Sequence, residues 1–96
     1  MIIVSQDKKT ILNFDNVVSI YVIRDAFSEE KGLKNYNIDY STNDEINIVI
    51  GTYATEVRAK EVLEDIIDKY EDIQILKYSR ESFATRDNFV YRMPKE

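Results

Sequence analysis

The sequence contains no cysteine, no histidine and no tryptophan, and these absences exclude several kinds of chemistry. Without cysteine the chain has no disulfide framework, and a cytoplasmic location is the simplest expectation. Without cysteine or histidine it has no thiolate nucleophile, no imidazole base and no usual zinc site. A magnesium or calcium site built from carboxylates alone stays open in principle, but no stretch has the spacing of an EF-hand or a phosphate-binding loop. We therefore expect neither a metal site nor a cofactor.

Glycine, proline and long apolar runs are also scarce. Two glycines and one proline leave few forced turns and no linker, so we expect residues 1–96 to form a single domain. No apolar run approaches the ~18 residues that a membrane span requires, and the first residues lack the basic start and apolar core of a signal peptide. We therefore expect no membrane partner. The net charge of −5 argues against non-specific binding to nucleic acid, which needs a basic surface.

Helical periodicity is present in one long stretch, which runs from Gly51 to Tyr70. Its apolar side chains recur at the spacing of one helix face, while most charged side chains fall on the other side. Thr52 or Thr55 can cap the first turn, and Glu56 places a negative charge near the N-terminus of the helix. The predicted apolar face consists of Ala59, Val62, Leu63, Ile66, Ile67 and Tyr70.

Most of the remaining chain alternates apolar and polar residues in the way that is typical of strands. The segment 17–24 is apolar on both faces, which indicates a central strand or one that a partner subunit covers. The segment 25–35 reads as a polar loop. We expect an α+β fold, with an antiparallel β-meander of about five strands covered by one amphipathic helix and a short C-terminal strand. The expected strands are residues 2–4, 10–14, 17–24, 36–41, 46–50, 73–78 and 88–93.

The basic-aromatic tail, residues 77–95, is the leading candidate for a site. It holds five Lys or Arg and two Asp or Glu, a balance of +3 that leaves −8 for the other residues. Arginines contact phosphates and aromatic rings stack on bases, so this composition suits a nucleotide pocket. The alternative is a last strand packed through Phe89 and Tyr91, with its basic groups paired to an acidic body. The tail residues that look least like core are Phe83, Arg86, Asn88 and Arg92.

Two further candidates have simpler alternatives. Arg24, at the end of a strand beside a loop that contains Phe27, can form a binding mouth, although a plain surface loop has the same pattern. The carboxylates on the helix between Glu61 and Asp68 can bind a divalent ion, although a solvated face broken by lysines and Arg58 is the preferred interpretation. No paired acid and base stands out, so we expect a protein that is not an enzyme.

Several short motifs are shared with other small proteins. They are Ile3-Val4-Ser5-Gln6-Asp7, Asn13-Phe14-Asp15-Asn16, Gly51-Thr52-Tyr53 before Arg58-Ala59-Lys60, and Tyr91-Arg92-Met93-Pro94. With these motifs the chain resembles small uncharacterised proteins from phages and prophages of low-GC Gram-positive bacteria. The chain is also similar in size class to the Thoeris anti-defence proteins. That resemblance implies a sheet, a helix and an oligomeric pocket in which aromatic and arginine side chains sequester a cyclic ADP-ribose-type signal without cleaving it.

Two hypotheses about function follow. The first is a non-catalytic, homo-oligomeric binding protein of phage or prophage type that sequesters a small phosphorylated nucleotide signal in the host cytoplasm. Counter-defence is one role that such a protein can have. The second is an acidic protein–protein inhibitor of a host defence or nucleic-acid-handling enzyme, because an acidic surface can imitate nucleic acid. The first hypothesis assigns ligand binding to Arg24 and to the four tail residues Phe83, Arg86, Asn88 and Arg92.

Overall fold

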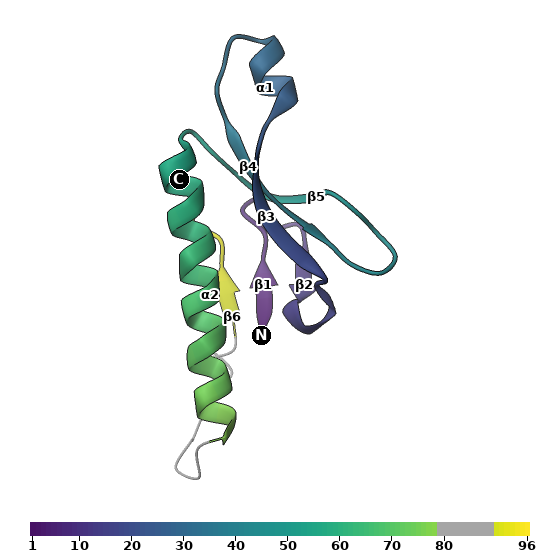
Figure 1. The fold of residues 1–96 in the computed structure, drawn as a ribbon, viewed down its shortest axis with the longest axis vertical. Coiled ribbons are helices and arrows are strands. Elements are labelled where there is room, and N and C mark those ends of the chain that lie inside the picture. The colour runs from purple at the N-terminus through teal and green to yellow at the C-terminus, as the bar shows by residue number, and fades with distance from the viewer. Residues whose placement is uncertain (79–89) are drawn as a thin grey trace.

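The structure, a computed structural model, describes residues 1–78 and 90–96. It confirms the α+β class, the single long covering helix and the short C-terminal strand (Figure 1). The strands form two three-stranded sheets, with strand orders β2-β1-β6 and β3-β4-β5. The elements are β1 (Ile2–Val4), β2 (Ile11–Asn13), the 3-10 helix η1 (Phe14–Asn16), β3 (Ser19–Arg24), α1 (Ala26–Glu30), β4 (Tyr36–Ser41), β5 (Ile48–Tyr53), α2 (Glu56–Tyr78) and β6 (Val90–Arg92).

The sheet β2-β1-β6 joins the two ends of the described chain. β1 and β2 form an antiparallel hairpin, whereas β6 lies parallel to β1 with Ile3 opposite Tyr91. Ile3 is fully buried and lies between the two neighbouring strands. The parallel pairing was not predicted, because the sequence pattern of β6 carries no information about its distant partner.

The sheet β3-β4-β5 is an antiparallel meander with β4 in the middle. The predicted hairpin of residues 36–41 and 46–50 is confirmed, but its second strand starts at Ile48 and continues to Tyr53. The expectation that segment 17–24 is a central strand is wrong, because β3 lies at the edge of this sheet. The predicted loop 25–35 contains the short helix α1, which Figure 1 shows at one end of the molecule.

The helix α2 begins later and ends later than its pattern predicts. Thr55 caps it, since its Oγ1 accepts a hydrogen bond from the backbone N–H of Arg58 at 3.1 Å. The strand predicted at 73–78 is wrong: Ile73 is fully buried and continues the spacing of the helix face from Ile66, and two-residue alternation with Ile75 imitated a strand. Ile67 is also corrected, because 44% of it is exposed. The residues of α2 that are fully buried are Ala59, Val62, Ile66 and Ile73.

Gln6, in the turn after β1, connects the two sheets. Its backbone N–H donates to the carbonyl of Ile50 at 2.9 Å. Its side-chain amide accepts from the N–H of Thr52 at 2.7 Å and donates to the carbonyl of the same residue at 2.9 Å. The amide also donates to the carbonyl of Lys95 at 2.8 Å. Gln6 therefore occupies the outer edge of β5 as an added strand residue would.

The segment after β6 packs against both sheets and α2. The Tyr53 hydroxyl donates to the carbonyl of Pro94 at 2.8 Å, and Arg58 Nε donates to the backbone oxygen of Glu96 at 2.9 Å. The methyl group of Met93 lies so close to Gly51 that a Cβ there would be 2.9 Å away, shorter than side chains tolerate. A side chain at position 51 would therefore force the Met93 methyl group to move.

Replacing each of two neighbouring isoleucines on α2 with aspartate tests whether this helix holds the fold together. Ile66→Asp places a carboxylate where the side chain is 0% exposed, and we expect a loss of stability of about 4 kcal/mol or more. Ile67→Asp is the matched control, because its site is 44% exposed and the change should cost about 1 kcal/mol or less. Thermal melts followed by circular dichroism measure both variants. Equal melting temperatures for the two would contradict the assigned helix face.

Candidate functional site

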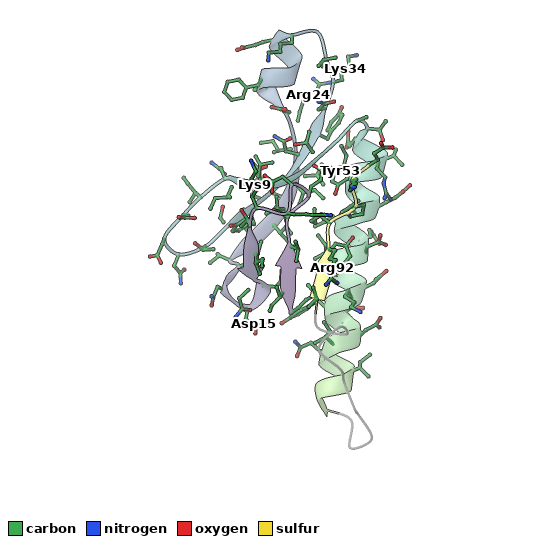
Figure 2. The ribbon with its side chains drawn as sticks, turned by 180° about the vertical axis from the view of Figure 1, so that it is seen from behind. Lys9, Asp15, Arg24, Lys34, Tyr53 and Arg92 are labelled. Atoms are coloured by element: carbon green, nitrogen blue, oxygen red, sulfur yellow. The ribbon has the colours of Figure 1, made fainter. Side chains whose placement is uncertain are left out.

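The Arg24 pocket, defined by Val22, Arg24, Tyr36, Glu56 and Lys60, brings one predicted site residue together with an aromatic ring and a second cation. Its volume is about 360 Å³. Arg24 and Tyr36 face each other across the β3–β4 pairing, and the first two turns of α2 supply the charged side chains of Glu56 and Lys60. Figure 2 shows Arg24 at the end of β3, where the chain turns towards α1.

Charges inside the Arg24 pocket are partly paired. Lys60 Nζ lies 2.7 Å from Glu56 Oε1, in an ion pair one helical turn long. The hydrogen bond and charge of Lys60, and to a lesser degree the charge of Arg24, hold the pKa of the Glu56 carboxyl below its ordinary value. Glu56 in turn raises the pKa of Lys60, first through the hydrogen bond. The charged side chains that line the pocket are thus two cations and one carboxylate, and cations of this kind contact anionic groups.

The Arg24 pocket offers binding groups of three kinds. A guanidinium makes two parallel hydrogen bonds to a phosphate, and an ammonium group adds a point charge. The ring of Tyr36 provides a face on which a base can stack. The Glu56 carboxyl has a lowered pKa, whereas a general base is useful when its pKa lies near the working pH. The pocket therefore offers groups that can hold an anion.

The structure separates one other predicted site residue, Arg92, from Arg24. Arg92 is exposed on β6, which belongs to the other sheet. Figure 2 shows Arg92 and Arg24 well apart from each other. Phe83, Arg86 and Asn88 lie outside the described residues. Sequence reasoning missed Tyr36, which was assigned only to a half-buried strand, and Lys60, which was assigned to a solvated helix face. Drawing the register between segments 17–24 and 36–41 would have placed Tyr36 opposite Arg24.

The described end of the basic-aromatic tail packs against the body of the protein. Tyr91 is half-buried against the core, and burial, then the nearby charges of Asp65 and Tyr53, raises its pKa to about 12. Burial likewise raises the pKa of Tyr53 to about 12. Both phenols are therefore neutral hydroxyls at physiological pH. Tyr91 therefore packs against the core from β6, as the alternative interpretation of a packed last strand expects.

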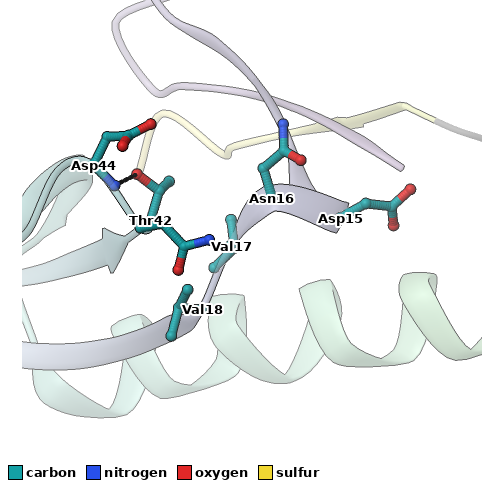
Figure 3. Close-up of a pocket in the computed structure, with 7 residues that line it drawn as sticks. Asp15, Asn16, Val17, Val18, Thr42 and Asp44 are labelled. Carbon is teal, nitrogen blue, oxygen red and sulfur yellow. Dashed lines mark hydrogen bonds between the residues drawn. The ribbon is translucent and has the colours of Figure 1, made fainter.

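A larger cavity, of about 460 Å³, lies between η1 and the turn after β4 (Figure 3). One of its polar side chains is engaged locally: Thr42 Oγ1 accepts from the N–H groups of Asp44 and Glu45 at 3.3 and 3.1 Å. Asp15 and Asp44 make it acidic, so it repels phosphate. Across the described part of the chain, no cluster of three or more His, Cys, Asp or Glu side chains could hold a metal. The cavity lining is Asp15, Asn16, Val17, Val18, Thr42, Asn43 and Asp44.

Asp39 is a buried carboxyl that belongs to neither cavity. It lies on the face of the β3-β4-β5 sheet opposite its inward-facing neighbours Ile38 and Tyr40, with Tyr21 and Val49 as its cross-strand partners. The residue is 6% exposed, and no described group donates a hydrogen bond to its Oδ1. Burial, and secondly the charge of Asp25, raises the pKa of this carboxyl. Its ionised form therefore destabilises the folded state.

Replacing Asp39 with asparagine should stabilise the protein at neutral pH, because the change removes a buried charge and keeps the shape. The folded state holds the Asp39 proton more tightly than the unfolded chain does. The contribution of Asp39 to the stability of the wild type therefore falls as the pH rises above about 3.8. We expect Asp39→Asn to gain on the order of 1 kcal/mol at pH 7 and to lose this advantage below about pH 3.8. Urea unfolding at the two pH values measures the difference. A less stable variant at pH 7 would contradict the assignment.

Comparisons of the chain with protein-family models, with curated proteins and with solved structures find no match. No helix in residues 1–78 or 90–96 has both the length and the apolar character to cross a membrane. Among the described residues, charged and aromatic side chains converge at the Arg24 pocket.

Proposed function

We propose that this protein is a non-catalytic binding protein of phage or prophage type that sequesters a small phosphorylated nucleotide in the Arg24 pocket. The observation that carries the proposal is the meeting of two cations and one aromatic ring around a hollow of about 360 Å³. That volume lies in the range of about 300–1,000 Å³ that is typical of small-molecule sites. In this proposal the protein acts in the host cytoplasm as a homo-oligomer and serves counter-defence.

Each side chain has a role in the proposed complex. Arg24 binds one phosphate through its planar guanidinium, and Lys60 contacts a second anionic oxygen. Tyr36 stacks on the base, and Glu56 keeps Lys60 in place through their 2.7 Å ion pair. Because the chain as a whole carries −5, binding depends on this local positive charge and weakens as salt screens it.

The resemblance to Thoeris anti-defence proteins supports the choice of ligand class. In that family aromatic and arginine side chains hold a cyclic ADP-ribose-type signal, and the Arg24 pocket offers the same two kinds of side chain. The tail residue Arg92 lies on β6 in the other sheet and is not part of the proposed site. The ligand classes to test first are cyclic ADP-ribose isomers, linear ADP-ribose and cyclic nucleotides.

Isothermal titration calorimetry against these three ligand classes tests the proposal. We expect one of them to bind the wild type, and Arg24→Ala and Lys60→Ala each to weaken binding by about tenfold or more, because each removes a charged hydrogen-bond donor. Arg92→Ala is the matched control and should bind as the wild type does. Mass spectrometry of the recovered ligand should show it intact. The proposal fails if the wild type gives no heat with any ligand, or if Arg92→Ala is the variant that loses binding.

The second candidate, an acidic protein–protein inhibitor of a host enzyme, is favoured by one surface of α2. A shallow hollow of about 430 Å³ there is lined by Val57, Lys60, Glu61, Glu64 and Asp65. Its exposed carboxylates beside an exposed valine suit a basic protein surface with an apolar centre.

Capture from a host lysate tests this second candidate. We expect the wild type to retain a stoichiometric partner that high salt releases, because exposed charges dominate the contact. The charge-neutral double variant Glu64→Gln/Asp65→Asn should lose that partner, while Arg24→Ala should keep it. Retention of the same partner by the double variant would rule out this surface.

A further inference from the structure

The outer edge of β3 carries backbone groups that no other strand of the structure uses. The N–H of Asp25 donates to the carbonyl of Asn35 at 2.9 Å, which makes these two residues a hydrogen-bonded pair. Such pairs alternate along an antiparallel ladder, so the backbone groups of Ile20 and Val22 point away from β4. No described group forms a hydrogen bond to them on that side. β3 therefore presents an open pairing edge.

The opposite edge of the same sheet is closed. Gln6 bonds to the outward-facing backbone groups of Ile50 and Thr52, at 2.7 to 2.9 Å, and so completes β5. In the other sheet the outer strands β2 and β6 have three residues each, whereas β3 has six. A sheet with one open edge and one closed edge can add one partner but cannot extend into a filament.

β3 lacks the devices that usually protect an edge strand. Its first five residues, Ser19 to Ile23, contain no charge and no proline, and its register with β4 shows no bulge. Ile23 and the preceding Val18 are 46% and 66% exposed. Apolar side chains therefore lie in solvent along an edge that is free to pair.

We propose that two copies of this chain pair antiparallel through β3, about a two-fold axis near Val22, and merge their β3-β4-β5 sheets into one six-stranded sheet. With this register the backbone groups of Ile20 and Val22 are satisfied by the second copy. Tyr21 lies opposite the second copy's Ile23, an aromatic and β-branched pair of the kind that stabilises antiparallel strands. Arg24 lies opposite the second copy's Ile20, so no like charges face each other.

This inference rests on the homo-oligomer of the proposed function and defines its interface. Its test uses no nucleotide, so a failure of β3 pairing can be distinguished from a failure of ligand binding. The first measurement is sedimentation equilibrium of the full chain. We expect the wild type to have about twice the 11.3 kDa mass of one chain. The double variant Val18→Lys/Ile23→Lys should weaken association by at least about tenfold, because lysines on an edge strand oppose pairing.

The matched control is Val57→Lys/Ile75→Lys, which adds the same charge at two α2 positions that are each 68% exposed. It should associate as the wild type does. Amide hydrogen exchange gives a second, direct readout: the N–H groups of Ile20 and Val22 should exchange slowly in the wild type and at least about tenfold faster in the β3 variant.

Three results would overturn the proposal. The first is a monomeric wild type, including one that uses this edge to capture a different protein. The second is an oligomer in which the amides of Ile20 and Val22 exchange rapidly. The third is an oligomer that the α2 control variant dissociates and the β3 variant does not.

Discussion

One apolar stripe on α2 has to serve two separate sheets, and the rest of the structure depends on this constraint. Val62, Ile66 and Ile73 are fully buried along it. The helix contacts all three strands of the β3-β4-β5 sheet, and farther along it Tyr70 packs on Phe14 with ring centroids 5.0 Å apart. A chain of 96 residues has little apolar surface to spare, so neither three-stranded sheet could close a core without the shared helix.

The same constraint places the polar features. Because α2 starts beside the end of β3 and the start of β4, its first two turns bring Glu56 and Lys60 to Arg24 and Tyr36. Its later turns hold Tyr91 in a low-dielectric position beside Asp65. The Arg24 pocket is thus built on the end of a rigid element, which is how precise binding geometry is usually maintained. The joint between the sheets, by contrast, is polar and depends on Gln6.

Local patterns predicted the elements whose partners are close in sequence. The hairpin of β4 and β5 follows from its alternation, and α2 follows from the spacing of Ala59, Val62 and Ile66. Local patterns could not predict the division into two sheets, because that depends on contacts between distant segments. The end of α2 was misjudged for a related reason: Ile73 and Ile75 fit a two-residue period as well as a helical one, and only burial against the sheets distinguishes the two.

The candidate site shows the same limit. Arg24 was recognised because it lies at a strand end beside a loop that contains Phe27, but its companions have ordinary local explanations. Tyr36 fits a half-buried strand, and Lys60 fits an ion pair with Glu56 one turn away. Their meeting depends on the register of β3 with β4 and on where α2 begins, and neither can be read from the residues themselves.

The parallel pairing of β6 with β1 has a consequence for how the protein forms during synthesis. Ile2 lies opposite Val90, so two paired residues of neighbouring strands are 88 positions apart in the sequence. The β1–β2 hairpin leaves the ribosome early, yet its inner strand gains a second neighbour only after α2 has been made. Closing so long a loop is entropically costly and is typical of slow folding steps. β1 is made before the other described strands but is among the last to be completed, and until then its free edge is open to wrong partners.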